Sequence, residues 1–276
     1  MRINKILNNN AVIIVEDGME KIVLGPGIAF QKSKNDIIQE QKIEKVFILK
    51  NETKQFQELL QSLPESYVSL AEDIITYTET KLNAELNSHI HIALTDHLAF
   101  AIDRIKKGIA IRNRLLSEVK VLYPKEYEIG LWAIEQVKLK LGVQLPIDEA
   151  GYIALHIHTS TINESNIDVP LKRTFILQDL MDIVASHLNI EINKESLSYY
   201  RFLTHLEFVI SRMEKNEAFH EMDIDMLKIV KSKYQQSYQC AEVLAIYLKE
   251  EYKYDVPESE IGFLTLHIQR LKDKNI

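Results

Sequence analysis

The chain has 276 residues, of which 46% are hydrophobic and 26% charged, and its formal net charge is −7. These proportions are typical of a globular protein with two or three domains. No apolar run approaches the roughly 18 residues of a membrane span, and Cys240, as the single cysteine, excludes an intrachain disulfide and a cysteine-ligated metal cluster. The N-terminus lacks the apolar core and cleavage site of a signal peptide, so we expect a cytoplasmic protein.

The charge is distributed unevenly. Residues 1–50 contain eight Lys and Arg against six Asp and Glu, so the remaining 226 residues carry −9. Because phosphate binding depends on local charge, a mildly basic head on an acidic body is compatible with a local site for a polyanion.

The first fifty residues predict a small antiparallel sheet. β-branched and partly alternating segments indicate strands at 2–7, 11–15, 21–24 and 45–49, and the apolar pattern resumes briefly at 28–30. Asp17-Gly18 offers a tight turn between the second and third strands. So few strands bury little surface, and we therefore expect this head to dimerise.

Beyond a polar linker expected near residues 51–57, the pattern becomes helical. Apolar residues recur at i, i+3, i+4 and i+7 in the segments 67–86, 90–107, 109–121, 126–142 and 149–159. Pro64, Pro124 and Pro146 stand at or near the helix boundaries. The helical pattern returns between residues 172 and 274, after a second linker expected at 163–170.

The helical region contains an internal duplication. The segment DHLAFAIDR at 96–104 returns as THLEFVISR at 204–212, and PIDEAGYIALHI at 146–157 returns as PESEIGFLTLHI at 257–268. The histidines of the two motifs are 59 residues apart in the first copy and 62 in the second. Recurrence in the same order and at similar spacing indicates a tandem repeat of one all-helical domain of roughly 100 residues. The repeated histidines are His97, His156, His205 and His267.

Paired histidines are compatible with several chemistries. Metal binding is disfavoured because the spacing lacks a His-x-x-x-His pair, and acid–base catalysis because no nucleotide loop or nucleophile elbow is present. Reversible phosphorylation needs only a neutral imidazole near pH 7. Arg104 and Arg212 follow His97 and His205 by seven residues on the same helix face, from which a guanidinium could reach a phosphate or a carboxylate. The alternative is that the duplication merely preserved core or surface histidines.

On these residues, the whole chain resembles the BglG/SacY/LicT family of transcriptional antiterminators, and within it the LicT-like β-glucoside branch. The order of the head and the two repeats agrees with that family. The matching motifs are Ile6–Asn10, Gly27–Lys32 and Ile43–Phe47 in the head, and Thr95–His97, Ala154–His156, Thr204–Leu206 and Thr265–His267 in the repeats.

The resemblance implies a multidomain α and β protein. Residues 1–55 would form a dimerising β-sheet RNA-binding head, and residues 64–168 and 169–276 two all-α helical-bundle domains regulated by the sugar phosphotransferase system. Such a protein binds an RNA hairpin, the ribonucleic antiterminator, in nascent mRNA and prevents an overlapping terminator from forming.

The resemblance also implies particular site residues. A sugar-specific enzyme II would phosphorylate the first pair, His97 and His156, and inactivate the protein, whereas the carrier HPr would phosphorylate the second pair and favour the active homodimer. One departure from the family pattern is Pro26, where a basic residue is common, so one RNA contact is expected to be missing. The implied RNA contacts are Lys5, Asn8, Asn10, Gly25, Gly27, Phe30 and Gln31.

Two other classes of protein remain as alternatives. A DNA-binding activator under the same control would need a helix-turn-helix head, which the strand pattern of residues 1–50 disfavours. A metal-dependent enzyme would need bound zinc or iron. We expect a regulator rather than an enzyme, with no catalytic residue, metal or cofactor.

Overall fold

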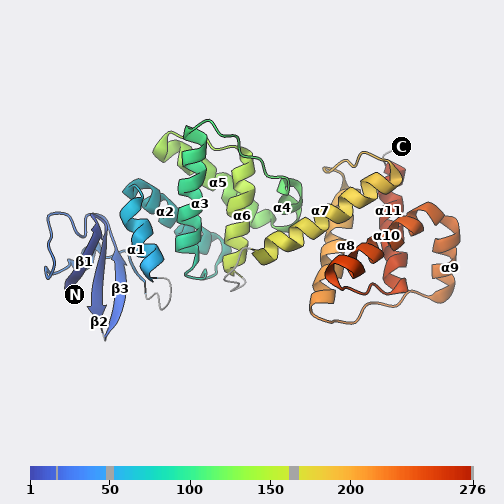
Figure 1. Ribbon diagram of the computed structural model, residues 1–276, viewed down its shortest axis with the longest axis horizontal. Helices are drawn as coiled ribbons and strands as arrows, with labels where there is room; N and C mark the ends of the chain where they lie inside the picture. Colours follow the sequence, from blue (N-terminus) through green and yellow to red (C-terminus); the bar gives the residue numbers. More distant parts are fainter. Residues whose placement is uncertain (17, 48–52, 162–167, 275–276) are drawn as a thin grey trace. The chain divides into compact units, whose positions relative to one another are not determined.

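The computed structural model describes residues 1–16, 18–47, 53–161 and 168–274 (Figure 1). The chain divides into two compact units, one made of residues 1–113 and 125–167 and the other of residues 114–124 and 168–276. In the described ranges, no helix is both long and apolar enough to cross a membrane.

The first unit begins with a four-stranded antiparallel sheet in the order β1-β2-β3-β4. The prediction of four strands is confirmed, and Gly18, at a φ of +73°, lies in the turn between β2 and β3. Asp17 lies outside the described residues. The segment 28–30 forms a turn rather than a strand, because its amides bond to the loops around it instead of to a ladder. The strands are β1 (Ile3–Asn8), β2 (Ala11–Glu16), β3 (Met19–Leu24) and β4 (Lys45–Phe47).

Both faces of this sheet are apolar, since successive side chains of a strand point to opposite faces. On one face Val12 and its neighbours pack against Ile28 and Ile38 from the loop that follows β3. On the other face Ile13 and its neighbours pack against Leu60, which is fully buried. The sheet thus gains a core from the helices that follow it, and dimerisation of the head stays a prediction.

In the part of the first unit that the structure describes, helices follow the sheet (Figure 1). The linker predicted near 51–57 is wrong for residues 53–57, which already belong to a helix; residues 51 and 52 lie outside the described chain. The helix predicted at 109–121 is also wrong for residues 109–115, because Gly108, at a φ of +71°, ends the preceding helix. The helices are α1 (Thr53–Ser62), α2 (Glu65–Leu82), α3 (Ile90–Lys106), α5 (Pro124–Leu141) and α6 (Ile147–Thr161).

Over residues 114–124 and 168–274 the second unit consists of helices and the loops that join them, and its core forms between α7, α8, α10 and α11. The linker predicted at 163–170 is wrong for its last three residues, since Pro170 stands in the first turn of α7, where a missing N–H is tolerated; residues 163–167 lie outside the described chain. The helices are α4 (Leu116–Leu122), α7 (Asp168–Leu188), α8 (Leu197–Glu214), α9 (Ile224–Lys233), α10 (Gln235–Tyr252) and α11 (Glu258–Lys274).

The short helix α4 lies between α3 and α5 in the sequence but packs on α7 and α8. Its Glu118 is fully buried and accepts hydrogen bonds from the Tyr199 hydroxyl at 2.8 Å and from Lys194 Nζ at 2.9 Å. Burial and the adjacent Glu118 carboxylate raise the pKa of Tyr199, so this hydroxyl remains a donor. The ion pair and hydrogen bond hold α4 on the second unit.

Candidate functional sites

The first candidate site is formed by the asparagine turn after β1 and the glycine loop after β3. Asn8 Oδ1 accepts from the Asn10 amide at 2.8 Å, and Asn10 Oδ1 accepts from the amide of Gly27. The Gly25 amide donates to the Asn10 carbonyl at 2.9 Å. The structure therefore brings four of the implied RNA contacts together. It also shows that both asparagine side chains help to hold the loop.

The fold itself requires a glycine at position 25, because a Cβ there would lie 1.7 Å from the Lys42 carbonyl oxygen. Beyond the glycines, Phe30 is 59% exposed and Gln31 adopts a φ of +56°. An exposed aromatic ring beside a tight backbone turn can stack on an unpaired base. Lys5 lies apart from this loop, exposed on β1 and paired in register with Ile13.

Lys42, which the sequence did not single out, lies next to this loop. Lys42 Nζ donates to the Gly27 carbonyl at 3.1 Å, and the lysine is exposed. It reaches the loop from fifteen residues further along the chain. Lys42 thus places a positive charge beside Pro26, the position at which the family pattern has a basic residue. Only the folded loop brings these two positions together, so sequence spacing gives no signal for it.

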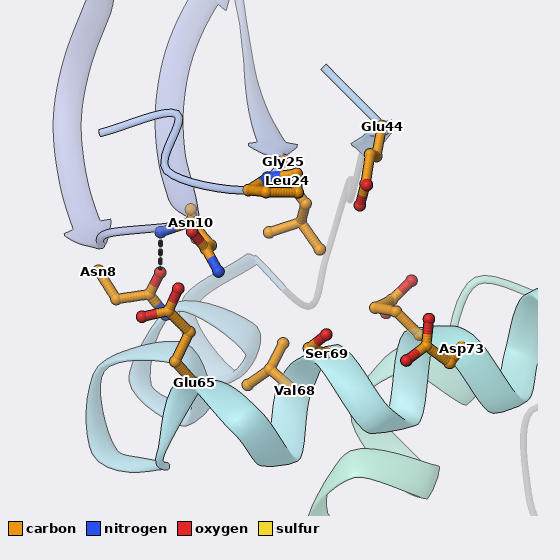
Figure 2. Close-up of a pocket in the computed structure, with 12 residues that line it drawn as sticks. Asn8, Asn10, Leu24, Gly25, Glu44, Glu65, Val68, Ser69 and Asp73 are labelled. Atoms are coloured by element: carbon orange, nitrogen blue, oxygen red, sulfur yellow. Dashed lines mark hydrogen bonds between the residues drawn. The ribbon is translucent and has the colours of Figure 1, made fainter. Parts of the chain in front are cut away.

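The inner side of the asparagine turn faces a pocket (Figure 2). Asn8 and Asn10 line one wall, and the opposite wall comes from α2 and carries the carboxylates of Glu65 and Asp73. Asn8 Nδ2 also donates to the Leu60 carbonyl at 3.0 Å. Because phosphates are repelled by carboxylates, the exposed Phe30 side of the loop is better suited to RNA than this pocket.

The second candidate site is the first histidine pair. His97 on α3 and His156 on α6 have ring centroids 4.7 Å apart at an interplanar angle of 44°. Nε2 of His97 lies 2.7 Å from Oε2 of Glu149, a carboxylate of α6 that is only 2% exposed. Burial, followed by the neighbouring His97, lowers the pKa of His156 well below the usual 6.5. His156 is therefore a neutral imidazole near pH 7.

The second pair repeats this arrangement. His205 on α8 and His267 on α11 have ring centroids 4.5 Å apart and nearly parallel planes, at 14°. Nε2 of His205 lies 2.6 Å from Oε1 of Glu260, which is 3% exposed. Burial and then His205 lower the pKa of His267 to about 4. Each copy thus combines a histidine beside a buried carboxylate with a second, neutral histidine.

The helices α5 and α6 come close together beside the first pair. A Cβ added to Gly130 of α5 would lie 2.2 Å from the Ala150 carbonyl oxygen. The absence of a side chain lets the two helices approach closely at the residue next to Glu149.

The two arginines and His158 make other contacts near the histidine pairs. From the sequence, Arg104 and Arg212 could reach a phosphate or a carboxylate; in the structure Arg104 donates to the Ala110 carbonyl at 3.1 Å, and Arg212 donates to the Ala218 carbonyl. Both arginines thus bond the loop that follows their helix, and both stack on a phenylalanine of the preceding turn. Nδ1 of His158, two residues after His156 on α6, lies 3.0 Å from Oε1 of Glu126. Over the described part of the chain, no group of three potential ligands could hold a metal ion.

Comparison with known proteins agrees with this organisation. Residues 1–56 match the CAT RNA binding domain, and residues 72–160 and 178–271 each match the PRD domain. The chain is 42% identical over 274 residues to Transcription antiterminator LicT of Bacillus subtilis (strain 168), covering 98% of this chain and 99% of the relative. It is 38% identical over 277 residues to the Beta-glucoside operon antiterminator of Dickeya chrysanthemi, covering 99% and 98%.

Among solved structures, the crystal structure of GlcT CAT-PRDI is similar, with a TM-score of 0.55 and 39% identity over 59% of this chain and 98% of that one. The fold and the domain matches define a regulatory protein with an RNA-binding head and a duplicated helical control domain. The chain belongs to the BglG/SacY/LicT family, as the sequence motifs predicted.

Proposed function

We propose that this protein is a sugar-responsive transcriptional antiterminator that binds an RNA hairpin in nascent mRNA and prevents a terminator from forming. The observation that carries the proposal is the exposed Phe30 on a glycine loop, within a head that matches an RNA-binding domain. The names of the two relatives support the same activity. A sheet at residues 3–47, where a DNA-binding activator would have a helix-turn-helix, speaks against that alternative.

The control we propose acts through the two histidine pairs in a cytoplasmic homodimer. Enzyme II would phosphorylate His97 and His156 and inactivate the protein, and HPr would phosphorylate His205 and His267 and favour activity. The proposed functional domains are residues 1–55, 64–168 and 169–276. The juxtaposed imidazoles support this proposal, because a phosphate with roughly two negative charges changes the local charge beside each pair and its buried carboxylate.

RNA binding is tested with the full chain and a labelled hairpin that contains bulged bases. Loss of a stacking aromatic costs about 1–3 kcal/mol per base, so Phe30→Ala should weaken binding by about fivefold to about 150-fold. Phe175→Ala is a matched control, since Phe175 is 49% exposed on α7. Asn10→Ala is less informative because its side chain holds Gly27. Equal affinity for bulged and fully paired hairpins, unaffected by Phe30→Ala, would contradict the proposal.

Phosphorylation is tested by incubating the full chain with enzyme I, HPr and phosphoenolpyruvate. We expect acid-labile phosphate on His205 or His267, and its loss when the labelled histidine is replaced by alanine. A chain that remains unlabelled at all four histidines, with enzyme II also supplied, would rule out the control mechanism while leaving RNA binding unaffected.

A further inference from the structure

A glutamate accompanies the histidines in the first copy. Glu149 precedes His156 by seven residues, which is two turns of α6 and therefore the same helix face. From this face the Glu149 carboxylate reaches Nε2 of His97, at 2.7 Å. The aligned motif of the second copy has a glutamate at the same position. The glutamate and the histidine therefore recur together in both copies.

In the second copy Glu260 precedes His267 by the same seven residues. Its Oε1 lies 2.6 Å from Nε2 of His205, although the two atoms lack the alignment of a hydrogen bond. That Nε2 atom is buried, whereas 20% of the His205 side chain is exposed. A donor protein therefore reaches another part of this imidazole more easily than Nε2.

Burial gives these carboxylates a specific role. Glu149 is 2% exposed and Glu260 is 3% exposed, and a buried carboxylate is strongly destabilising unless a hydrogen-bond donor or a cation accompanies it. In the first copy the Nε2 atom of His97 supplies that partner, and in the second copy Nε2 of His205 lies 2.6 Å from the carboxylate without an aligned hydrogen bond. A carboxylate bonded to one ring nitrogen fixes both the orientation of the ring and the nitrogen that carries the proton.

We propose that Glu149 and Glu260 are positioning residues that keep the proton on Nε2 of His97 and His205 and leave Nδ1 as the nucleophile. The inference rests on the proposed phosphorylation of these histidines and specifies its chemistry. It assigns different roles within each pair: the first histidine donates its Nε2 proton toward the carboxylate, whereas the second histidine lies on the same helix as the carboxylate.

The phosphoryl transfer then balances without a further reactant. The Nδ1 lone pair of His97 attacks the phosphorus of a protonated phosphohistidine on the donor protein. The P–N bond of the donor breaks, its electron pair returns to the donor nitrogen, and the donor leaves as neutral imidazole. The phosphorylated ring of His97 keeps its Nε2 proton and becomes a cation, which the Glu149 carboxylate neutralises.

The first test needs no phosphorylation. In the full chain with ¹⁵N-labelled histidine, two-bond ¹H–¹⁵N correlation spectra report which ring nitrogen carries the proton. We expect His97 and His205 to be protonated on Nε2. Glu149→Ala should give a mixed population at His97 alone, and Glu149→Gln, whose amide oxygen still accepts, should restore the single form. The exposed Glu128→Ala on α5 serves as the control.

The second test is the site of phosphorylation. With enzyme I, HPr, enzyme II and phosphoenolpyruvate, the same spectra should show phosphate on Nδ1 of His97 and His205. Glu149→Ala and Glu260→Ala should each lower labelling of their own histidine about tenfold, as loss of an orienting group does, and distribute the phosphate over both nitrogens.

Phosphate on Nε2 in the unsubstituted protein, or Nδ1-protonated His97 that Glu149→Ala leaves unchanged, would overturn the inference. A chain without any phosphohistidine would refute the proposed control instead. In that case the protonation state of His97 in the unphosphorylated protein still decides whether Glu149 positions the ring.

Discussion

Replacing Glu118 by alanine should destabilise the second unit selectively. The substitution removes a fully buried carboxylate and leaves the Tyr199 hydroxyl, also fully buried, without its acceptor. An orphaned buried hydroxyl costs about 1–3 kcal/mol. Lys194 is 40% exposed at its side chain, so loss of its ion pair adds no more than about 1 kcal/mol. We expect a total loss of about 2–3 kcal/mol.

The assay uses the single tryptophan of the chain. Trp132 stacks on Tyr77 in the first unit, with ring centroids 3.8 Å apart, so its fluorescence reports on that unit while circular dichroism reports on all helices. For a unit of this size about 4 °C corresponds to 1 kcal/mol, so Glu118→Ala should lower the Tm of the second-unit transition by about 10 °C and leave the fluorescence transition nearly unchanged.

Two comparisons sharpen this prediction. Glu250→Ala, at an exposed position of α10, should change stability by less than about 0.5 kcal/mol. Tyr199→Phe removes the hydroxyl that Glu118→Ala orphans, so the double variant should lose less stability than the sum of the single variants. A Glu118→Ala protein that melts like Glu250→Ala, or whose fluorescence transition falls as far as its dichroism transition, would refute the assignment of α4 to the second unit.

Three other measurements follow from the structure. Lys42→Gln should lower the slope of log affinity for RNA against log salt by about 0.7–0.9, the value for one phosphate contact, whereas the ion-paired Lys21→Gln should not. Gly130→Ala places a Cβ 2.2 Å from the Ala150 carbonyl oxygen; overpacking of this kind costs about 1–3 kcal/mol, and an unshifted tryptophan transition would contradict it. Burial lowers the pKa of His267 to about 4, against about 6.5 in the unfolded chain. Between these values the unfolded state binds the extra proton, so the free energy of unfolding falls as the pH drops from 6.5 to 4. In urea denaturation, His267→Gln should reduce this loss by roughly 2 kcal/mol after solvent screening; an unchanged pH dependence would contradict the assignment.

The duplication singled out the four histidines as candidate site residues. It did not single out the two glutamates, for a physical reason. Glu149 and Glu260 occupy equivalent positions in the repeated motif, so the signal was present in the sequence. A glutamate two turns before a histidine nevertheless looks like any residue of a solvated helix face. Only the fold shows that both carboxylates are buried and that each reaches an imidazole on another helix.

Spacing along a helix is a poor guide beyond the residue at which the helix ends. Arg104 shares a helix face with His97, but Gly108 turns the chain and brings the Ala110 carbonyl within reach of the guanidinium. The apolar periodicity of residues 109–115 continued through that turn although the backbone did not remain helical. Periodicity also identifies an amphipathic helix such as α4 without indicating which core its apolar face joins.

The placement of α4 limits how the two repeats can be exchanged in engineered proteins. The chain passes from one compact unit to the other after residues 113, 124 and 167. A single cut between residues 161 and 168 therefore leaves residues 114–124, which belong to the second unit, joined to the first. A chimaera joined at that point would present Glu118 and Val119 of one parent to the α7 and α8 surface of another. Successful domain exchange in this protein therefore requires residues 114–124 to be transferred together with the second repeat.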